Sequence, residues 1–138
     1  MSFATLRAAL MFLALTVLAL TVAAQAQGDF PFGQELILEE QPLPGARQRP
    51  ILNVGTGGDA EIDLWCYSGM GRVAVAGDTV SISLGSFTPE QGRCTPERMQ
   101  ADQQLAADLA QVTAWRREGE DIIVLVGPRD LRFRQSAH

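Results

Sequence analysis

The chain has 138 residues, of which 46% are hydrophobic and 20% are charged, and its net charge is −5. Its basic residues are all arginines, and they are scattered along the sequence instead of forming a basic stripe. An acidic chain without a basic patch is not expected to bind nucleic acid.

Residues 1–26 have the pattern of a cleaved secretory signal. The run from Ala8 to Ala24 is apolar, Arg7 is the only charge before it, and Ala24-Gln25-Ala26 matches a small-residue cleavage site. A retained membrane anchor is the alternative, but the run of about 17 residues is shorter than the roughly 20 of a typical span. We therefore expect cleavage after Ala26, no stable membrane span afterwards, and a periplasmic or secreted product.

The mature part is predicted to be a flexible lead-in at 27–33 followed by a single domain at 34–138. With 16 acidic residues and 10 arginines it carries a charge of −6. Its first strands are predicted at 35–40 and 51–54, separated by a loop that contains three prolines and a glycine.

A third strand is predicted at 60–67, where polar and apolar residues alternate. Ala60, Ile62, Leu64 and Cys66 would face inward, and Trp65 would share the outer face with three carboxylates. Gly77-Asp78 then predicts a tight turn between strands at 72–76 and 79–84.

One amphipathic helix is expected at about 96–111. Thr95 is a suitable N-cap and Pro96 a suitable first helical residue. Apolar residues recur at three- and four-residue spacing and form one stripe, made of Met99, Leu105, Ala106, Leu109 and Val112. Strands at 113–117, 122–126 and 131–134 follow, and the middle one is apolar on both faces.

The two cysteines, Cys66 and Cys94, are most simply a disulfide in an exported protein. Reactive thiols and a metal site are the alternatives. The apolar setting predicted for Cys66 argues against reactive thiols. A metal site is disfavoured because the single histidine, His138, stands at the C-terminus.

These elements predict an α+β fold. Because nearly every connection is short, the seven to eight strands should form a strongly bent, partly closed antiparallel sheet with the helix packed across it.

From Leu64 to Arg134 the sequence resembles the META/HslJ domain family of small bacterial envelope proteins. The resemblance is carried by Cys66 with two following glycines, the GDTVSI strand, Cys94 leading into the helix, the LAQVTAWRREGEDIIVL block and the closing GPRDLRFR. It implies a single α+β domain with an incompletely closed sheet and a Cys66–Cys94 pair.

Some members of the family are linked to heat shock, antibiotic tolerance, motility or virulence. The fold also looks like that of pilot lipoproteins, whose cracked barrel can hold an acyl chain. Tyr67 stands where the family usually has asparagine, so a role tied to that residue does not carry over.

No catalytic residue, metal ligand or cofactor site is predicted, because the sequence pairs no nucleophile with a base. We expect a non-enzymatic structural or interaction module of the cell envelope, with a link to stress. The alternative is a carrier or sensor of an apolar, lipid-like ligand. The partner would be an envelope protein or that ligand, and the protein itself a monomer. A possible apolar groove between helix and sheet would be formed by Trp65, Ile82, Met99, Leu105, Leu109, Trp115 and Val124.

Overall fold

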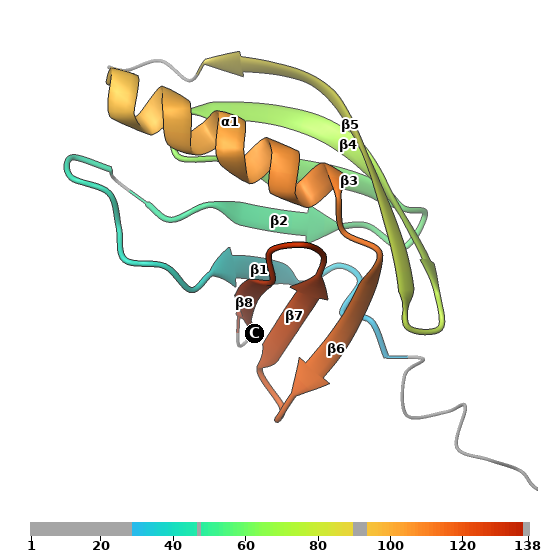
Figure 1. Ribbon diagram of the computed structural model, residues 1–138. Coiled ribbons are helices and arrows are strands. Elements are labelled where there is room, and N and C mark those ends of the chain that lie inside the picture. Colours follow the sequence, from blue (N-terminus) through green and yellow to red (C-terminus); the bar gives the residue numbers. More distant parts are fainter. Residues whose placement is uncertain (1–28, 47, 90–93, 137–138) are drawn as a thin grey trace, which may run out of the picture.

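The computed structural model describes residues 29–46, 48–89 and 94–136. Within these ranges the chain forms eight strands and one helix (Figure 1). In chain order they are β1 (Glu35–Leu38), β2 (Ile51–Val54), β3 (Asp59–Asp63), β4 (Tyr67–Ala76), β5 (Thr79–Pro89), α1 (Pro96–Ala110), β6 (Ala114–Glu118), β7 (Ile122–Val126) and β8 (Leu131–Gln135).

Each strand pairs antiparallel with the next, and β1 also pairs with β8, so the sheet closes into a barrel. The closure is uneven. β4 and β5 pair along almost their whole length, whereas β5 and β6 meet only at Thr79 and Ala114. The chain from β5 to β6 passes through α1, which lies across the side of the barrel where these strands diverge (Figure 1). The predicted α+β fold with a strongly bent antiparallel sheet and one helix is confirmed.

The core is built from alternate residues of the strands, as the period of two requires. In β1 and β2 every second residue is buried, and in β8 Leu131 and Phe133 point inward. The largest fully buried side chains come from strands on both sides of the barrel and from α1; they include Phe133, Leu36, Leu38, Leu52, Ile62, Leu109, Ile123 and Leu125.

Helix α1 begins where its sequence predicts. Thr95 has an extended backbone conformation, and its Oγ1 accepts the backbone N–H of Arg98 at 3.3 Å. Leu105 and Leu109 of the apolar stripe are buried. The helix also buries two carboxylates, Asp102 and Asp108, which periodicity alone would place on the wet face.

The predicted strand at 60–67 is divided in the structure. β3 ends at Asp63, the chain turns through 64–66, and β4 begins at Tyr67. Trp65, expected on the outer face, is instead 8% exposed because it lies in this turn, not in a continuous strand. The alternating pattern does not reveal the turn because the N–H groups of Trp65, Cys66 and Tyr67 are bonded to Asp102, which lies far along the chain.

The β4–β5 pair depends on glycines that let two backbones approach closely. The register shifts between Gly69 and Gly71. A Cβ at Gly69 would lie 2.6 Å from the Ser86 carbonyl oxygen and 2.7 Å from Phe87 Cδ1. Such contacts cannot be relieved without moving backbone, so the bulge requires glycine here.

We predict that Gly69→Ala lowers the free energy of unfolding by about 2 kcal/mol, within the usual cost of overpacking. Gly57→Ala is the matched control, since a Cβ there meets no atom within 4 Å. Urea unfolding of both variants is the measurement. Equal midpoints for the two variants would contradict the close approach at Gly69.

The segment from Asp29 to Gly33, expected as a flexible lead-in, packs against the barrel. Phe30 is 5% exposed, and its ring meets Trp115 edge-on with centroids 5.3 Å apart. Arg117 donates to the Asp29 carbonyl oxygen at 2.8 Å. The ring contact of Phe30 with Trp115 and the hydrogen bond from Arg117 therefore hold this segment against β6.

Strand β7 is apolar on both faces, as predicted. Ile123 and Leu125 belong to the core, so Val124 points to the outside of the barrel, yet it is 0% exposed. Its cross-strand neighbours are Arg116 and Arg132. Their aliphatic stems can cover it while their charged ends remain in water. An apolar residue on the outside of the barrel is thus flanked by two arginines whose stems suit it.

Those charged side chains form a network over β6, β8 and the end of β1. Arg116 pairs with Glu118 at 3.2 Å, Arg132 hydrogen-bonds Glu118, and Arg134 reaches Glu39 at 2.5 Å. The bond from Arg132 holds the pKa of Glu118 below its ordinary value. Because the groups are exposed, each pair contributes little stability.

Candidate functional site

The turn between β3 and β4 is held by a buried carboxylate from α1. Asp102 Oδ1 accepts the backbone N–H of Trp65 at 2.7 Å, and its Oδ2 accepts those of Cys66 and Tyr67 at 2.9 Å each. Asp102 is 3% exposed. Three successive N–H groups that converge on one anion form a nest, and this satisfies donors that the turn would otherwise bury unpaired.

Burial raises the pKa of Asp102 above its ordinary value of 3.8. The three backbone N–H bonds and the charge of Arg98 act in the opposite direction and do not outweigh the loss of hydration. The folded protein therefore holds this proton more tightly than the unfolded chain does.

The sign of this shift gives a test. The Asp102 proton adds stability below the ordinary pKa, and this contribution is lost as the pH rises through the higher pKa of the folded state. An NMR titration of the Asp102 carboxyl carbon should therefore have its midpoint above 3.8. Asp102→Asn identifies the signal. A midpoint below that value would mean that the N–H bonds outweigh burial.

The same turn is tied to the start of the helix by a disulfide. Cys66 and Cys94 are bonded, and their Cα atoms are 5.6 Å apart. The predicted pair is thus present in the structure. Cys94 directly precedes the N-cap Thr95, so the disulfide and Asp102 connect the turn to successive parts of α1.

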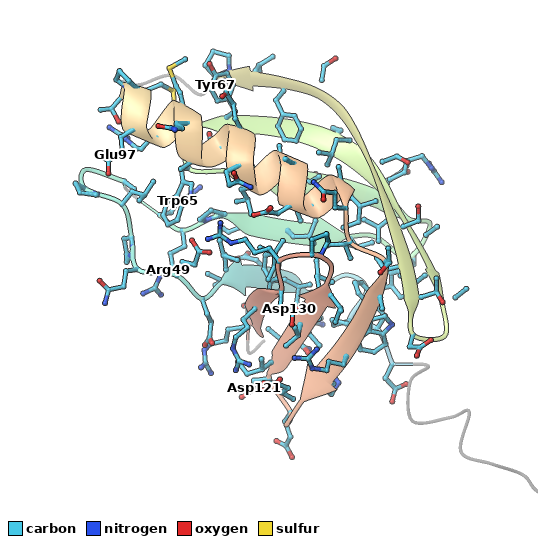
Figure 2. The ribbon with its side chains drawn as sticks, viewed as in Figure 1. Arg49, Trp65, Tyr67, Glu97, Asp121 and Asp130 are labelled. Atoms are coloured by element: carbon cyan, nitrogen blue, oxygen red, sulfur yellow. A yellow bond between two sulfur atoms is a disulfide. The ribbon has the colours of Figure 1, made fainter. Side chains whose placement is uncertain are left out.

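A small groove opens beside this connection, between α1 and the ends of β4 and β5. Its volume is about 200 Å³. We call it the α1–β4 groove; it is lined by Leu64, Tyr67, Phe87, Met99, Asp102, Gln103 and Ala106. Most of its surface is apolar. Met99 is 36% exposed, and Figure 2 shows Tyr67 near the N-terminal half of α1.

A larger hollow of about 520 Å³ runs along another part of α1. Its described lining comes entirely from the helix and is rich in glutamine: Glu97, Gln100, Ala101, Gln103, Gln104 and Ala107. Without an opposing apolar wall among the described residues, it offers little for a ligand to be buried against.

Only one of the seven residues predicted for an apolar groove, Met99, lines the α1–β4 groove. The other six are 8% exposed or less: Trp65, Ile82, Leu105, Leu109, Trp115 and Val124. Trp115 lies beside Phe30 and donates its Nε1–H to the Gly77 carbonyl at 2.7 Å. The sequence pattern does not single out Tyr67, Phe87 or Asp102, because it predicts a strand end for Tyr67, a loop for Phe87 and the polar face of the helix for Asp102.

The described part of the chain contains no group of three or more His, Cys, Asp or Glu side chains that could hold a metal ion. Among the same residues, no helix is long and apolar enough to cross a membrane.

No known family model matches the chain, and no curated protein matches it either. Among solved structures, a protein from Burkholderia xenovorans determined by NMR superposes with a TM-score of 0.57. The two sequences are 18% identical, and the match covers 84% of this chain and 88% of the other. At this identity the likeness concerns the fold alone.

Proposed function

We propose that the protein is an exported, non-enzymatic interaction module of the META/HslJ type, acting in the bacterial cell envelope and linked to stress. It would use the α1–β4 groove to bind one side chain of a partner protein, with apolar contact to the groove walls. The observation that carries this proposal is a small, open, mostly apolar groove beside the buried hydrophobic core.

The size of the groove favours a protein partner over a lipid-like ligand. Sites for small molecules usually enclose about 300–1,000 Å³, whereas this groove has about 200 Å³. Ile82, Leu105 and Leu109, which would have to line an internal cavity for an acyl chain, belong to the packed core. A partner side chain needs only a short, rigid depression, and the disulfide and Asp102 supply that rigidity.

The first experiment is mass spectrometry of the protein after export to a bacterial periplasm. The denatured mass should correspond to cleavage after Ala26 and to an oxidised cysteine pair. The native mass should show a monomer without a passenger. Extra mass that detergent removes would support the apolar-ligand alternative instead.

The second experiment places a photo-crosslinking amino acid at Met99, with Thr56, exposed on the β2–β3 turn, as the control position. A partner protein should be captured from Met99 and not from Thr56. With that partner purified, Met99→Ala should weaken binding about tenfold, as the loss of one buried apolar contact requires. Equal capture at both positions, or unchanged binding by Met99→Ala, would refute a role for the groove.

A further inference from the structure

The α1–β4 groove combines two aromatic side chains with a carboxylate. Tyr67 and Phe87 line it from β4 and β5, and Asp102 lines it from α1. Asp102 is bonded to the backbone N–H of Tyr67 itself, and Phe87 is seated against Gly69, where a Cβ would meet its ring at 2.7 Å. The backbone of Tyr67 and the ring of Phe87 are thus each held by a contact to another element.

The charge of Asp102 has no ion-pair partner among the described residues. Its hydrogen bonds come from three backbone N–H groups, which stabilise a carboxylate through their dipoles but do not neutralise it. Arg98 acts on it only at longer range, and its guanidinium Nε donates to Thr95 Oγ1. A buried carboxylate therefore lies beside a groove lined by two aromatic side chains, and aromatic rings attract cations over their faces.

The rest of the lining is largely aliphatic, from Leu64, Met99 and Ala106. A group that complements all of these surfaces has an aliphatic stem and a positive end. Arginine suits the groove less well than lysine, because its planar fork needs two free acceptor positions side by side, and three N–H groups already occupy the Asp102 oxygens. A lysine ammonium is a compact charge that needs no such geometry.

Building on the proposed function, we infer that the α1–β4 groove binds a lysine side chain of a partner protein, with its stem against Leu64, Met99 and Ala106 and its ammonium between the aromatic faces and Asp102. The sequence also restricts which protein can supply this lysine. This chain contains no lysine, so the side chain of a second copy cannot supply the group. The net charge of −5 also favours a basic partner segment.

The test is an NMR titration that follows the methyl groups of Met99 and Ala106. The probe is Nα-acetyl-lysine methylamide, and its neutral counterpart is Nα-acetyl-norleucine methylamide, which keeps the stem and lacks the ammonium. The lysine probe should shift both methyl signals and bind about fivefold more tightly than the norleucine probe, the ratio expected for a cation at aromatic faces. The arginine analogue should bind more weakly than lysine.

Phe87→Leu keeps an apolar wall and removes the aromatic face, so it should reduce lysine binding about fivefold. Phe87→Tyr should restore it, and Met70→Leu is the control, since Met70 lies on the same strand as Tyr67 but is 52% exposed and outside the groove. Equal binding of the two probes, or no binding of either, would overturn the lysine inference. The crosslinking experiment tests the proposed function separately. If a partner is captured at Met99 but places a side chain other than lysine in the groove, only the lysine inference is contradicted.

Discussion

Replacing Asp102 with alanine is expected to lower the free energy of unfolding by about 3–5 kcal/mol, which corresponds to roughly 10–20 °C in melting temperature. The substitution removes the acceptor of three backbone N–H groups in the β3–β4 turn. Each buried donor left without a partner costs about 1–3 kcal/mol, and the total is reduced because the half-buried Tyr67 end of the turn can relax towards water.

Asp102→Asn separates the hydrogen bonds from the shape of the side chain. An amide has one acceptor oxygen, so its NH₂ group must face either the N–H of Trp65 or those of Cys66 and Tyr67. We expect about half the loss caused by alanine. Gln103→Ala, at the exposed neighbouring position, should change stability by less than about 0.5 kcal/mol. The nest would have no energetic role if Asp102→Ala and Gln103→Ala unfolded at the same urea concentration.

Removal of the disulfide is expected to cost about 3.5 kcal/mol, the chain-entropy value for a loop of this length. The two cysteines are 28 residues apart in sequence. Cys94→Ser is the better variant, because Cys94 is only partly buried, whereas a substitution at the buried Cys66 would also create a cavity. Cys66→Ala should therefore lower the melting temperature further.

Urea unfolding of oxidised protein, reduced protein and Cys94→Ser makes the measurement. Reduced wild type and Cys94→Ser should have similar midpoints, both well below that of the oxidised protein, and reductant should leave Cys94→Ser unchanged. If reduction leaves the wild-type urea midpoint nearly unchanged, the bond is not what holds the turn to the helix.

Cys94→Ser and Asp102→Ala act on the same turn, so their effects should not be additive. Once the disulfide is absent, the turn can separate more easily from α1, and the three N–H groups can reach water. The combined loss is expected to be smaller than the sum of the single losses. Simple additivity would mean that the two connections act independently.

Local sequence determines most of the regular elements. The helix begins at Pro96 because Thr95 can cap it and proline lacks the N–H that the first turn would leave unpaired. The turn at Gly77-Asp78 joins β4 to β5, and the alternation of β5 buries Val80 and Ile82. These features depend on residues within a few positions of one another, so composition and period reveal them.

The disulfide is an intermediate case. An even pair of cysteines in a chain that is expected to be exported predicts a bond without any knowledge of the fold. What the bond connects, the β3–β4 turn and the residue before the N-cap of α1, becomes visible only once both elements are placed.

The tertiary structure alone decides the candidate site. The strand predicted at 60–67 breaks because its N–H groups are satisfied by Asp102, which lies 35–37 residues later in the chain. On the helix, the same aspartate looks like one more residue of the polar face. The groove likewise depends on the β4–β5 bulge, which places Phe87 opposite Gly69. Local patterns describe how a residue relates to its neighbours in sequence. A buried carboxylate is stable only when backbone N–H groups from elsewhere in the chain donate to it, and this pairing exists only in the folded protein.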